Sequence, residues 1–130
     1  MADKVLLAQW SSGYRSHVAV RDFDVVADEP ESVGGTDEGP TPTELFLISL
    51  ATCFTMAVAH AARKRDVRLD ELSVRIEADY EGNRFGWIRL AVTTDLADDL
   101  AERLIERAKA YCFVSNTIMQ PPRIEYALAN

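Results

Sequence analysis

The sequence contains little cysteine and no excess of basic charge, and each shortage excludes a class of protein. Two cysteines among 130 residues are too few for a disulfide-rich secreted scaffold. Only 14 lysines and arginines stand against 21 acidic residues, which gives a net charge of −7. Such a chain lacks the basic footprint that binds nucleic-acid phosphates or an anionic membrane surface. We therefore expect no nucleic-acid partner and no membrane partner.

A secretory signal is also missing from the pattern of the first residues. The stretch MADKVLLAQWSS has one lysine and only a short apolar patch, which is not the organisation of such a signal. Together with the low cysteine content, this predicts a reducing cytoplasmic location. A long-lived structural disulfide is unusual there, whereas a transient catalytic one is not.

One long apolar run is present, over residues 45–62. Five alanines, three hydroxyl side chains and His60 interrupt it, so we interpret it as a core helix rather than a membrane span. A helix that is apolar on every side needs partners all round, and one small sheet with one amphipathic helix covers only part of it. The sequence therefore predicts a homodimer with this helix at the interface.

The remaining patterns predict one α+β domain over residues 1–130, in which helices cover an antiparallel sheet. Thr41 and Glu44 form a capping-box pattern at the start of a long helix that ends near Arg65. A second helix is expected at 97–111 and a short turn or helix at 113–119. Alternating residues predict strands at 4–10, 14–20, 23–27, 72–81, 87–94 and 123–128, with a long loop at 28–42.

The cysteines lie at the middle of the first helix, Cys53, and at the end of the second, Cys112. Free cysteine is among the most buried residue types, so packing is the first interpretation of both. A zinc site would require the two cysteines, His17 and His60 to converge without any short-range pairing. We therefore expect no metal, and the spacing alone leaves packing and thiol chemistry both open.

The segment GGTDEGPTPTELFLISLATCFTMAV, with the later LSVRIEADYE and YCFVSNTI, resembles the OsmC/Ohr family of thiol-dependent peroxidases over nearly the whole chain. The broad OsmC-like branch is nearest. This resemblance implies an OsmC-like fold, with antiparallel sheets packed on a long central helix, in an intertwined homodimer without a cofactor. It implies that Cys53 attacks an organic hydroperoxide or hydrogen peroxide and that Cys112 of the same chain resolves the product. A thiol or dithiol reductant would restore both.

The resemblance also implies a cation beside the reactive thiol, supplied by an arginine of the N-terminal sheet and held by an acid near the helix start. Arg15 matches the arginine best and Arg21 is the fallback. Glu44 is the candidate acid, although the Ohr pattern has glutamate directly after the proline, where this chain has Thr43. The alternative function is a non-catalytic OsmC-fold protein that binds a small hydrophobic ligand at the dimer interface.

Overall fold

Most helices and strands form where the sequence pattern predicts them. The computed structural model describes residues 2–129. Contacts divide the chain into two units, residues 1–48 and 49–130, and the boundary falls inside helix α1 (Pro42–Lys64). The single domain over 1–130 therefore stays a prediction, and each unit is described by itself.

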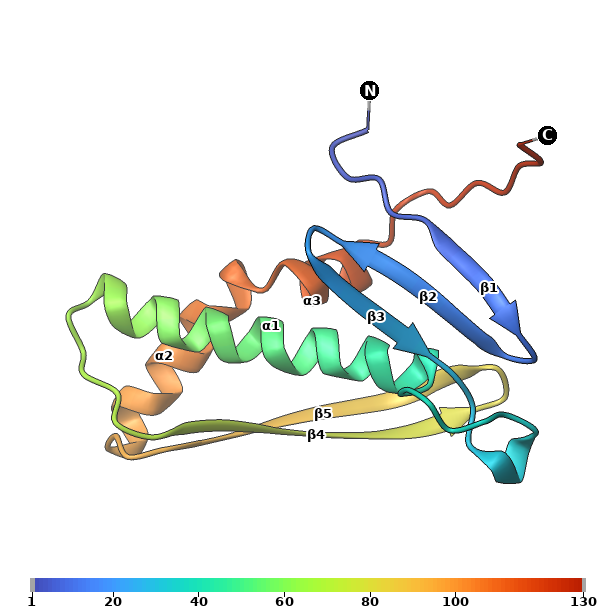
Figure 1. Cartoon of the computed structure of the whole chain (residues 1–130). Helices are drawn as coiled ribbons and strands as arrows, with labels where there is room; N and C mark the ends of the chain where they lie inside the picture. Colours follow the sequence, from blue (N-terminus) through green and yellow to red (C-terminus); the bar gives the residue numbers. More distant parts are fainter. Residues whose placement is uncertain (1, 130) are drawn as a thin grey trace. The chain divides into compact units, whose positions relative to one another are not determined.

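The first unit contains a three-stranded antiparallel sheet in the order β1-β2-β3 (Figure 1). Its strands are β1 (Ala8–Ser12), β2 (Arg15–Val20) and β3 (Phe23–Ala27). Val20 faces Phe23, so Arg21 and Asp22 form the two-residue connection of a hairpin, with Arg21 at a φ of 53°. This confirms the predicted hairpin, while β1 begins four residues later than the expected strand at residue 4.

Residues 28–41, which we call the Asp28 loop, connect β3 to α1 and contain a single 3₁₀ turn, η1 (Glu31–Val33). The N–H of Asp28 donates to the Pro40 carbonyl at 3.1 Å, so the two ends of the loop lie together. At its end the predicted capping box is present. The Glu44 N–H donates to Thr41 Oγ1 at 3.1 Å, and the Thr41 N–H donates to Glu44 Oε1 at 2.9 Å.

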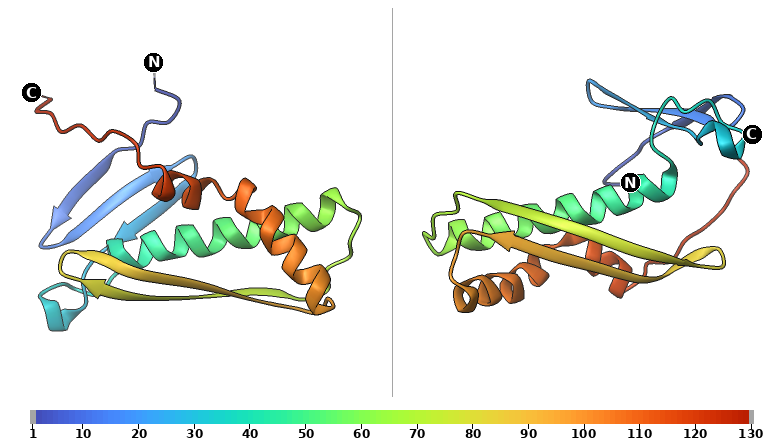
Figure 2. Two further views of the ribbon diagram at one scale, coloured as in Figure 1. Left: turned by 180° about the vertical axis from the view of Figure 1, so that it is seen from behind. Right: turned by 90° about the horizontal axis from the view of Figure 1, so that it is seen from below.

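The second unit is built on a long antiparallel hairpin of β4 (Leu72–Glu81) and β5 (Arg84–Thr94). Helix α2 (Asp98–Tyr111) follows, and then the short α3 (Phe113–Met119). Figures 1 and 2 show α2 and the second-unit part of α1 on the same face of this hairpin. The prediction of an α+β chain with antiparallel sheets and a long helix is confirmed.

The core of the second unit lies between these two helices and the hairpin. Its main part, which we call the thiol cluster, contains Leu50, Phe54, Ala57, Val58, Ala108 and Cys112. One face of the hairpin packs against it, through Leu72, Val74, Ile76, Ile88, Leu90 and Val92. These are the alternate positions that the strand pattern points inward. A smaller cluster of Ala61, Ala62 and Leu104 extends the core toward the end of α1.

The predicted last strand at 123–128 is wrong. These residues carry no strand in the structure, and Tyr126 and Leu128 remain 92% and 85% exposed. The alternation of RIEYAL is real, but a strand also needs a free neighbouring edge whose backbone groups complete its hydrogen bonds. Within the described part of the chain, no strand pairs with this segment.

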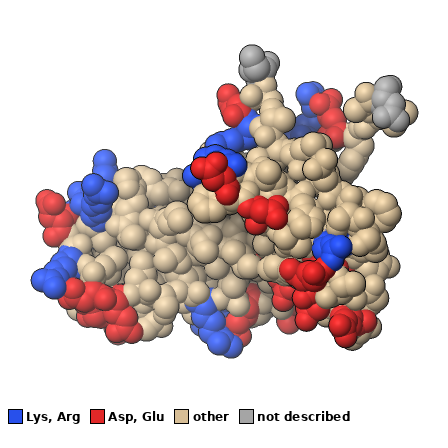
Figure 3. Space-filling view, in the orientation of Figure 1, with Lys and Arg blue, Asp and Glu red and all other residues tan. Residues whose placement is uncertain are grey.

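Helix α1 is long and apolar enough to cross a membrane by length and composition, two criteria that core helices of soluble proteins also meet. Only 33% of its most apolar window is buried by the chain itself, and Met56 is 71% exposed. No charged residue occurs between Glu44 and Arg63, and Figure 3 shows the middle of the helix as an uncharged surface. The exposed side of this part of the helix is therefore an apolar face available for a partner.

Candidate functional site

The two cysteines belong to the same part of the core. Cys53 is half-buried on α1 and packs against the thiol cluster, of which Cys112 is a fully buried member at 0% exposure. Both thiols are free. Two residues 59 positions apart in the sequence thus meet in one apolar environment, because α1 and α2 pack side by side on the hairpin.

The backbone around Cys112 is fixed by the junction of two helices. Cys112 follows the last residue of α2 and precedes the first residue of α3. Its carbonyl accepts the N–H of Asn116 at 3.0 Å and the hydroxyl of Ser115 at 3.2 Å. The chain changes direction at Cys112, between α2 and α3, and these hydrogen bonds fix the backbone there while the thiol stays in the core.

A ring contact joins α1 to the end of α2 beside Cys112. His60 and Tyr111 meet edge to face, with ring centroids 4.7 Å apart. Such pairs contribute about 0.5–1.5 kcal/mol beyond the area they bury. His60 lies about two helical turns after Cys53, so the contact holds the segment that carries Cys112 against the helix that carries Cys53.

Arg15, at the start of β2 in the first unit, has each guanidinium nitrogen engaged. One terminal nitrogen forms an ion pair with Glu38, Nε donates to Ser11 Oγ at 3.0 Å, and the other terminal nitrogen donates to Ser12 Oγ at 3.2 Å. A guanidinium has five N–H donors in a rigid plane, so three such contacts fix its orientation and leave donors for a further partner.

The acid that pairs with Arg15 is therefore Glu38, and sequence reasoning missed it. The carboxylate of Glu44 instead accepts the Thr41 N–H and closes the capping box. The Asp28 loop has five acidic residues, Asp28 included, and no local pattern singles out one of them as the partner of Arg15. The ion pair of Glu38 depends on how the loop folds back on β3, which the spacing of residues does not reveal.

Asp28 is a buried charged side chain, with 1% exposure, and it is surrounded by donors. Its carboxylate accepts the Thr36 hydroxyl at 2.5 Å and three backbone N–H groups, from Glu29 at 2.7 Å, Glu38 at 3.2 Å and Thr36 at 3.4 Å. The Thr36 hydroxyl above all, with the backbone donors and the charge of Arg15, outweighs burial and lowers the pKa of Asp28 below its ordinary 3.8. The group is therefore a carboxylate at neutral pH.

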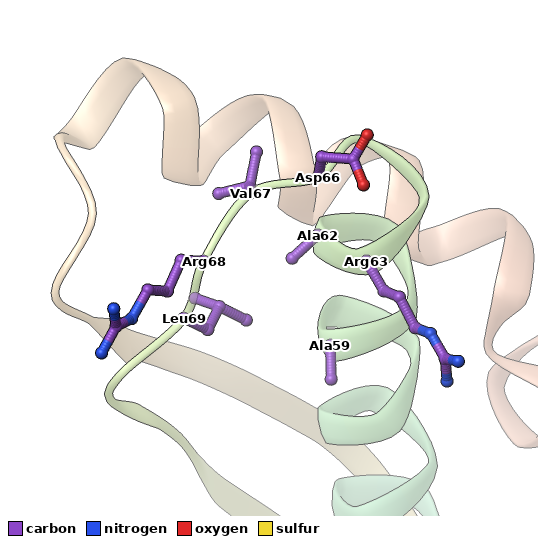
Figure 4. A pocket seen from close by; sticks show the side chains of 7 residues that line it. All are labelled: Ala59, Ala62, Arg63, Asp66, Val67, Arg68 and Leu69. Atoms are coloured by element: carbon purple, nitrogen blue, oxygen red, sulfur yellow. The ribbon is translucent and has the colours of Figure 1, made fainter.

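Each unit has a hollow whose lining contains neither thiol. The first is lined by Arg15, His17, Val26 and Glu38 and has a volume of about 320 Å³. The second, of about 410 Å³, lies at the end of α1 beside residues 66–69 (Figure 4). Figure 4 shows the charged ends of Arg63 and Arg68 pointing away from it, and Arg68 pairs with Asp70 at 2.8 Å. Its lining therefore offers little polar chemistry.

A metal would need several ligand side chains in one place. Among residues 2–129 no group of three or more histidine, cysteine, aspartate or glutamate side chains lies close enough to hold an ion. His17 instead lies 3.2 Å from Asp24 through its Nδ1. The described residues thus present two reactive features, the two free thiols of one cluster and the oriented guanidinium.

Comparison with known proteins identifies the family. The sequence model of OsmC-like proteins matches residues 35–127. The chain belongs to the OsmC-like family. Over 98 residues it is 29% identical to the organic hydroperoxide resistance protein OhrB of Bacillus subtilis, covering 72% of this chain and 71% of the relative.

Solved structures agree with this assignment. An organic hydroperoxide resistance protein, OsmC, of Legionella pneumophila is 26% identical, with a TM-score of 0.69 over 91% of each chain. A putative osmotic stress induced and detoxification response protein of Psychrobacter arcticus superposes with a TM-score of 0.77, over 90% of this chain and 89% of that one. At 17% identity the second likeness concerns the fold alone. The predicted OsmC-like fold is thereby confirmed.

Proposed function

We propose that this OsmC-like protein is a homodimeric, cofactor-free, thiol-dependent peroxidase that reduces organic hydroperoxides or hydrogen peroxide in the cytoplasm. The observation that carries the proposal is the shared environment of the two free thiols, with Cys53 half-buried and packed against the cluster that contains Cys112. The names of the relatives in B. subtilis and L. pneumophila, both organic hydroperoxide resistance proteins, support the substrate class.

The reaction needs only these two thiols and an external reductant. The Cys53 thiolate attacks one oxygen of the O–O bond, which breaks, and the thiol becomes a sulfenic acid while the other oxygen leaves as an alcohol or water after taking a proton. The Cys112 thiol then displaces hydroxide from the Cys53 sulfur, which gives a Cys53–Cys112 disulfide and water. A dithiol, or two thiols, reduces the disulfide by exchange and is itself oxidised.

The two thiols differ in access, which fits two different roles. A half-buried thiol can meet a small peroxide, whereas a fully buried one is shielded from it. Shielding suits a resolving thiol, because it reacts only with a neighbouring sulfenic acid. Cys53 is thus the peroxidatic residue and Cys112 the resolving residue of this proposal.

Arg15 and Glu44 have separate roles in the proposed site. Apolar surroundings disfavour a thiolate by desolvation, and a nearby cation compensates. In the proposed dimer Arg15, with its plane fixed by Glu38 and two serines, is that cation. Glu44 acts at a different point, since its capping box stabilises the start of the helix that carries Cys53.

The apolar surface that one chain leaves uncovered supports the proposed homodimer. Met56 on α1 and Phe113 and Met119 on α3 are all well exposed in the single chain. Large exposed apolar side chains, together with a helix α1 of which only 33% of the most apolar window is buried, are typical of an interface. We expect the purified protein to have twice the 14.5 kDa of one chain, measured by light scattering during size-exclusion chromatography.

Turnover of tert-butyl hydroperoxide with dithiothreitol tests the proposal. Cys53→Ser should abolish peroxide consumption. Cys112→Ser without reductant should consume one equivalent and stop as a sulfenic acid, whereas the wild type stops as a disulfide, because the variant has no resolving thiol. Full activity in Cys53→Ser contradicts the mechanism. An inert wild-type protein that binds a hydrophobic dye in its dimeric form would favour the alternative, a non-catalytic binding protein.

A further inference from the structure

We propose that the Asp28 loop is a positioning device in which buried Asp28 holds Glu38, and Glu38 orients the guanidinium of Arg15. The inference rests on the proposed function, because Arg15 matters there as the cation of the thiol site. It assigns the orienting carboxylate to a loop residue that precedes the cysteine helix by four positions, and it makes Glu44 a helix cap only.

The first step is the contact between Glu38 and Arg15. Glu38 forms the ion pair with one terminal nitrogen of Arg15, while Ser11 and Ser12 accept hydrogen bonds from the other two nitrogens. The Arg15 side chain is 26% exposed and that of Glu38 is 52% exposed. An ion pair so open to water contributes little by itself unless its geometry is imposed by the surroundings. The question is therefore what fixes Glu38.

Asp28 fixes the backbone of Glu38. Its Oδ2 accepts the Glu38 N–H at 3.2 Å and the Thr36 hydroxyl at 2.5 Å, and its Oδ1 accepts the Glu29 N–H at 2.7 Å. One carboxylate thus joins both sides of the loop. A buried carboxylate is tolerated when its lone pairs are satisfied in this way, and the same bonds make the loop conformation unique.

Close backbone approach leaves this loop little freedom. A Cβ at Gly39 would lie 2.2 Å from the Val26 carbonyl oxygen, and one at Gly35 would lie 1.9 Å from the Glu29 carbonyl oxygen. Only glycine fits at both positions, one of which directly follows Glu38. The Asp37 N–H also donates to the Glu29 carbonyl at 3.0 Å. Glu38 is therefore presented from a segment packed against the end of β3.

The register of the sheet brings Arg15 and Asp28 together. Ser16 of β2 faces Ala27 of β3, so Arg15 and Asp28 are the next positions across the same ladder. The charge of Arg15 contributes to the lowered pKa of Asp28, as expected for neighbours. Arg15 thus has the Glu38 carboxylate in direct contact and the Asp28 carboxylate close by, so two carboxylates of the Asp28 loop act on one guanidinium.

Exchange of the Arg15 Nε proton with water, followed by nuclear magnetic resonance of the full-length protein, measures this positioning directly. Glu38→Gln should speed the exchange by about tenfold, because loss of the charge-assisted bond at the terminal nitrogen frees the guanidinium plane and so weakens the hydrogen bond from Nε to Ser11. Thr36→Val should also speed it, because Asp28 then holds the loop with one donor fewer. Glu31→Gln is the matched control, since it removes one negative charge from the same loop, and it should change the exchange by less than about twofold.

Hydroperoxide turnover shows whether this positioning serves the reaction. Glu38→Gln should lower kcat/KM by about tenfold in wild type and have no further effect in Arg15→Ala, because Glu38 acts through Arg15. Unchanged Arg15 exchange in Glu38→Gln, equal acceleration by Glu44→Gln, or an undiminished effect of Glu38→Gln in Arg15→Ala would each overturn the inference. A wild-type protein without any turnover contradicts the proposed function alone, because the exchange measurement still decides whether Glu38 orients Arg15.

Discussion

Asp28 in the first unit and Cys112 in the second are both almost completely buried, at 1% and 0% exposure, yet their surroundings have little in common. Asp28 is enclosed by hydrogen-bond donors from its own loop, within ten residues. Cys112 is enclosed by aliphatic and aromatic side chains from two helices and a hairpin. The first environment is local and polar, and the second is long-range and apolar.

This difference separates two requirements of the proposed reaction. A guanidinium must point in a fixed direction, which directional hydrogen bonds achieve. Two thiols from distant parts of the sequence must share one dry region, which helix packing achieves. Substitutions that remove volume should therefore damage the thiol cluster, and substitutions that remove a donor should damage the Asp28 loop.

The largest effect is expected from a cavity in the thiol cluster. Leu50 is 3% exposed, and Leu50→Ala should lower the free energy of unfolding by about 2–5 kcal/mol, measured by urea denaturation. Leu50→Met is the control, because it conserves volume and should cost less than about 1.5 kcal/mol. Equal losses in the two variants would show that the cluster does not depend on close packing.

A smaller loss is expected when the Asp28 loop loses a donor. Thr36→Val keeps the shape of the side chain and removes the hydroxyl that donates to Asp28 at 2.5 Å. Urea denaturation should show a lower free energy of unfolding, by less than for Leu50→Ala, since three backbone donors to Asp28 remain. Thr93→Val makes the same change at an exposed strand position and should stay within about 0.5 kcal/mol of wild type.

The cap of α1 should contribute less again. Thr41→Ala removes the oxygen that accepts the Glu44 N–H and should cost about 1 kcal/mol in thermal or urea unfolding. Thr41→Ser retains a hydroxyl and should recover most of this stability. A cap substitution that instead abolished peroxide turnover, with the fold intact, would give the Thr41–Glu44 pair a part in the chemistry.

The smallest effect concerns an exposed aspartate in the second unit. The Glu71 N–H, at 3.1 Å, is the main cause of the lowered pKa of Asp95, and the Asp70 N–H adds to it. A carboxylate with a lowered pKa stabilises the folded state above its ordinary 3.8 and loses that contribution as the pH falls through its folded value.

Asp95→Asn should therefore reduce the difference in unfolding free energy between about pH 6 and about pH 3, measured by urea denaturation at both. Salt should shrink the effect, because the group is exposed. A variant with the same acid sensitivity as wild type would contradict this assignment.

Local signals in the sequence predicted most of the fold. The bounds of β3 and β4 agree with the expected strands, and α1 begins at the proline that follows the Thr41 cap. These elements depend on alternation and capping, which involve residues close in sequence. The segment at 123–128 shows the limit, because its alternation predicts a strand but says nothing about which edge would pair with it.

The candidate site likewise has residues that the sequence predicted and residues that it did not. A resemblance carried by the segment around Cys53 and by YCFVSNTI singled out both cysteines, and the structure then brought them into contact with one cluster. The role of Glu38 could not be predicted from the sequence, because its pairing with Arg15 depends on a loop that closes through Asp28 and two glycines. The sequence favoured Glu44 as the partner of Arg15, because a glutamate near a helix start is expected both in a capping box and as an ion-pair partner.

The mass of the intact protein after one equivalent of tert-butyl hydroperoxide, without reductant, tests the central claim most directly. The wild type should become lighter by two hydrogen atoms, and digestion should yield one linked peptide pair from a single chain, containing Cys53 and Cys112. The variant Cys112→Ser should instead become heavier by one oxygen, located at Cys53. An unchanged mass, or a disulfide that joins two chains, would contradict the account.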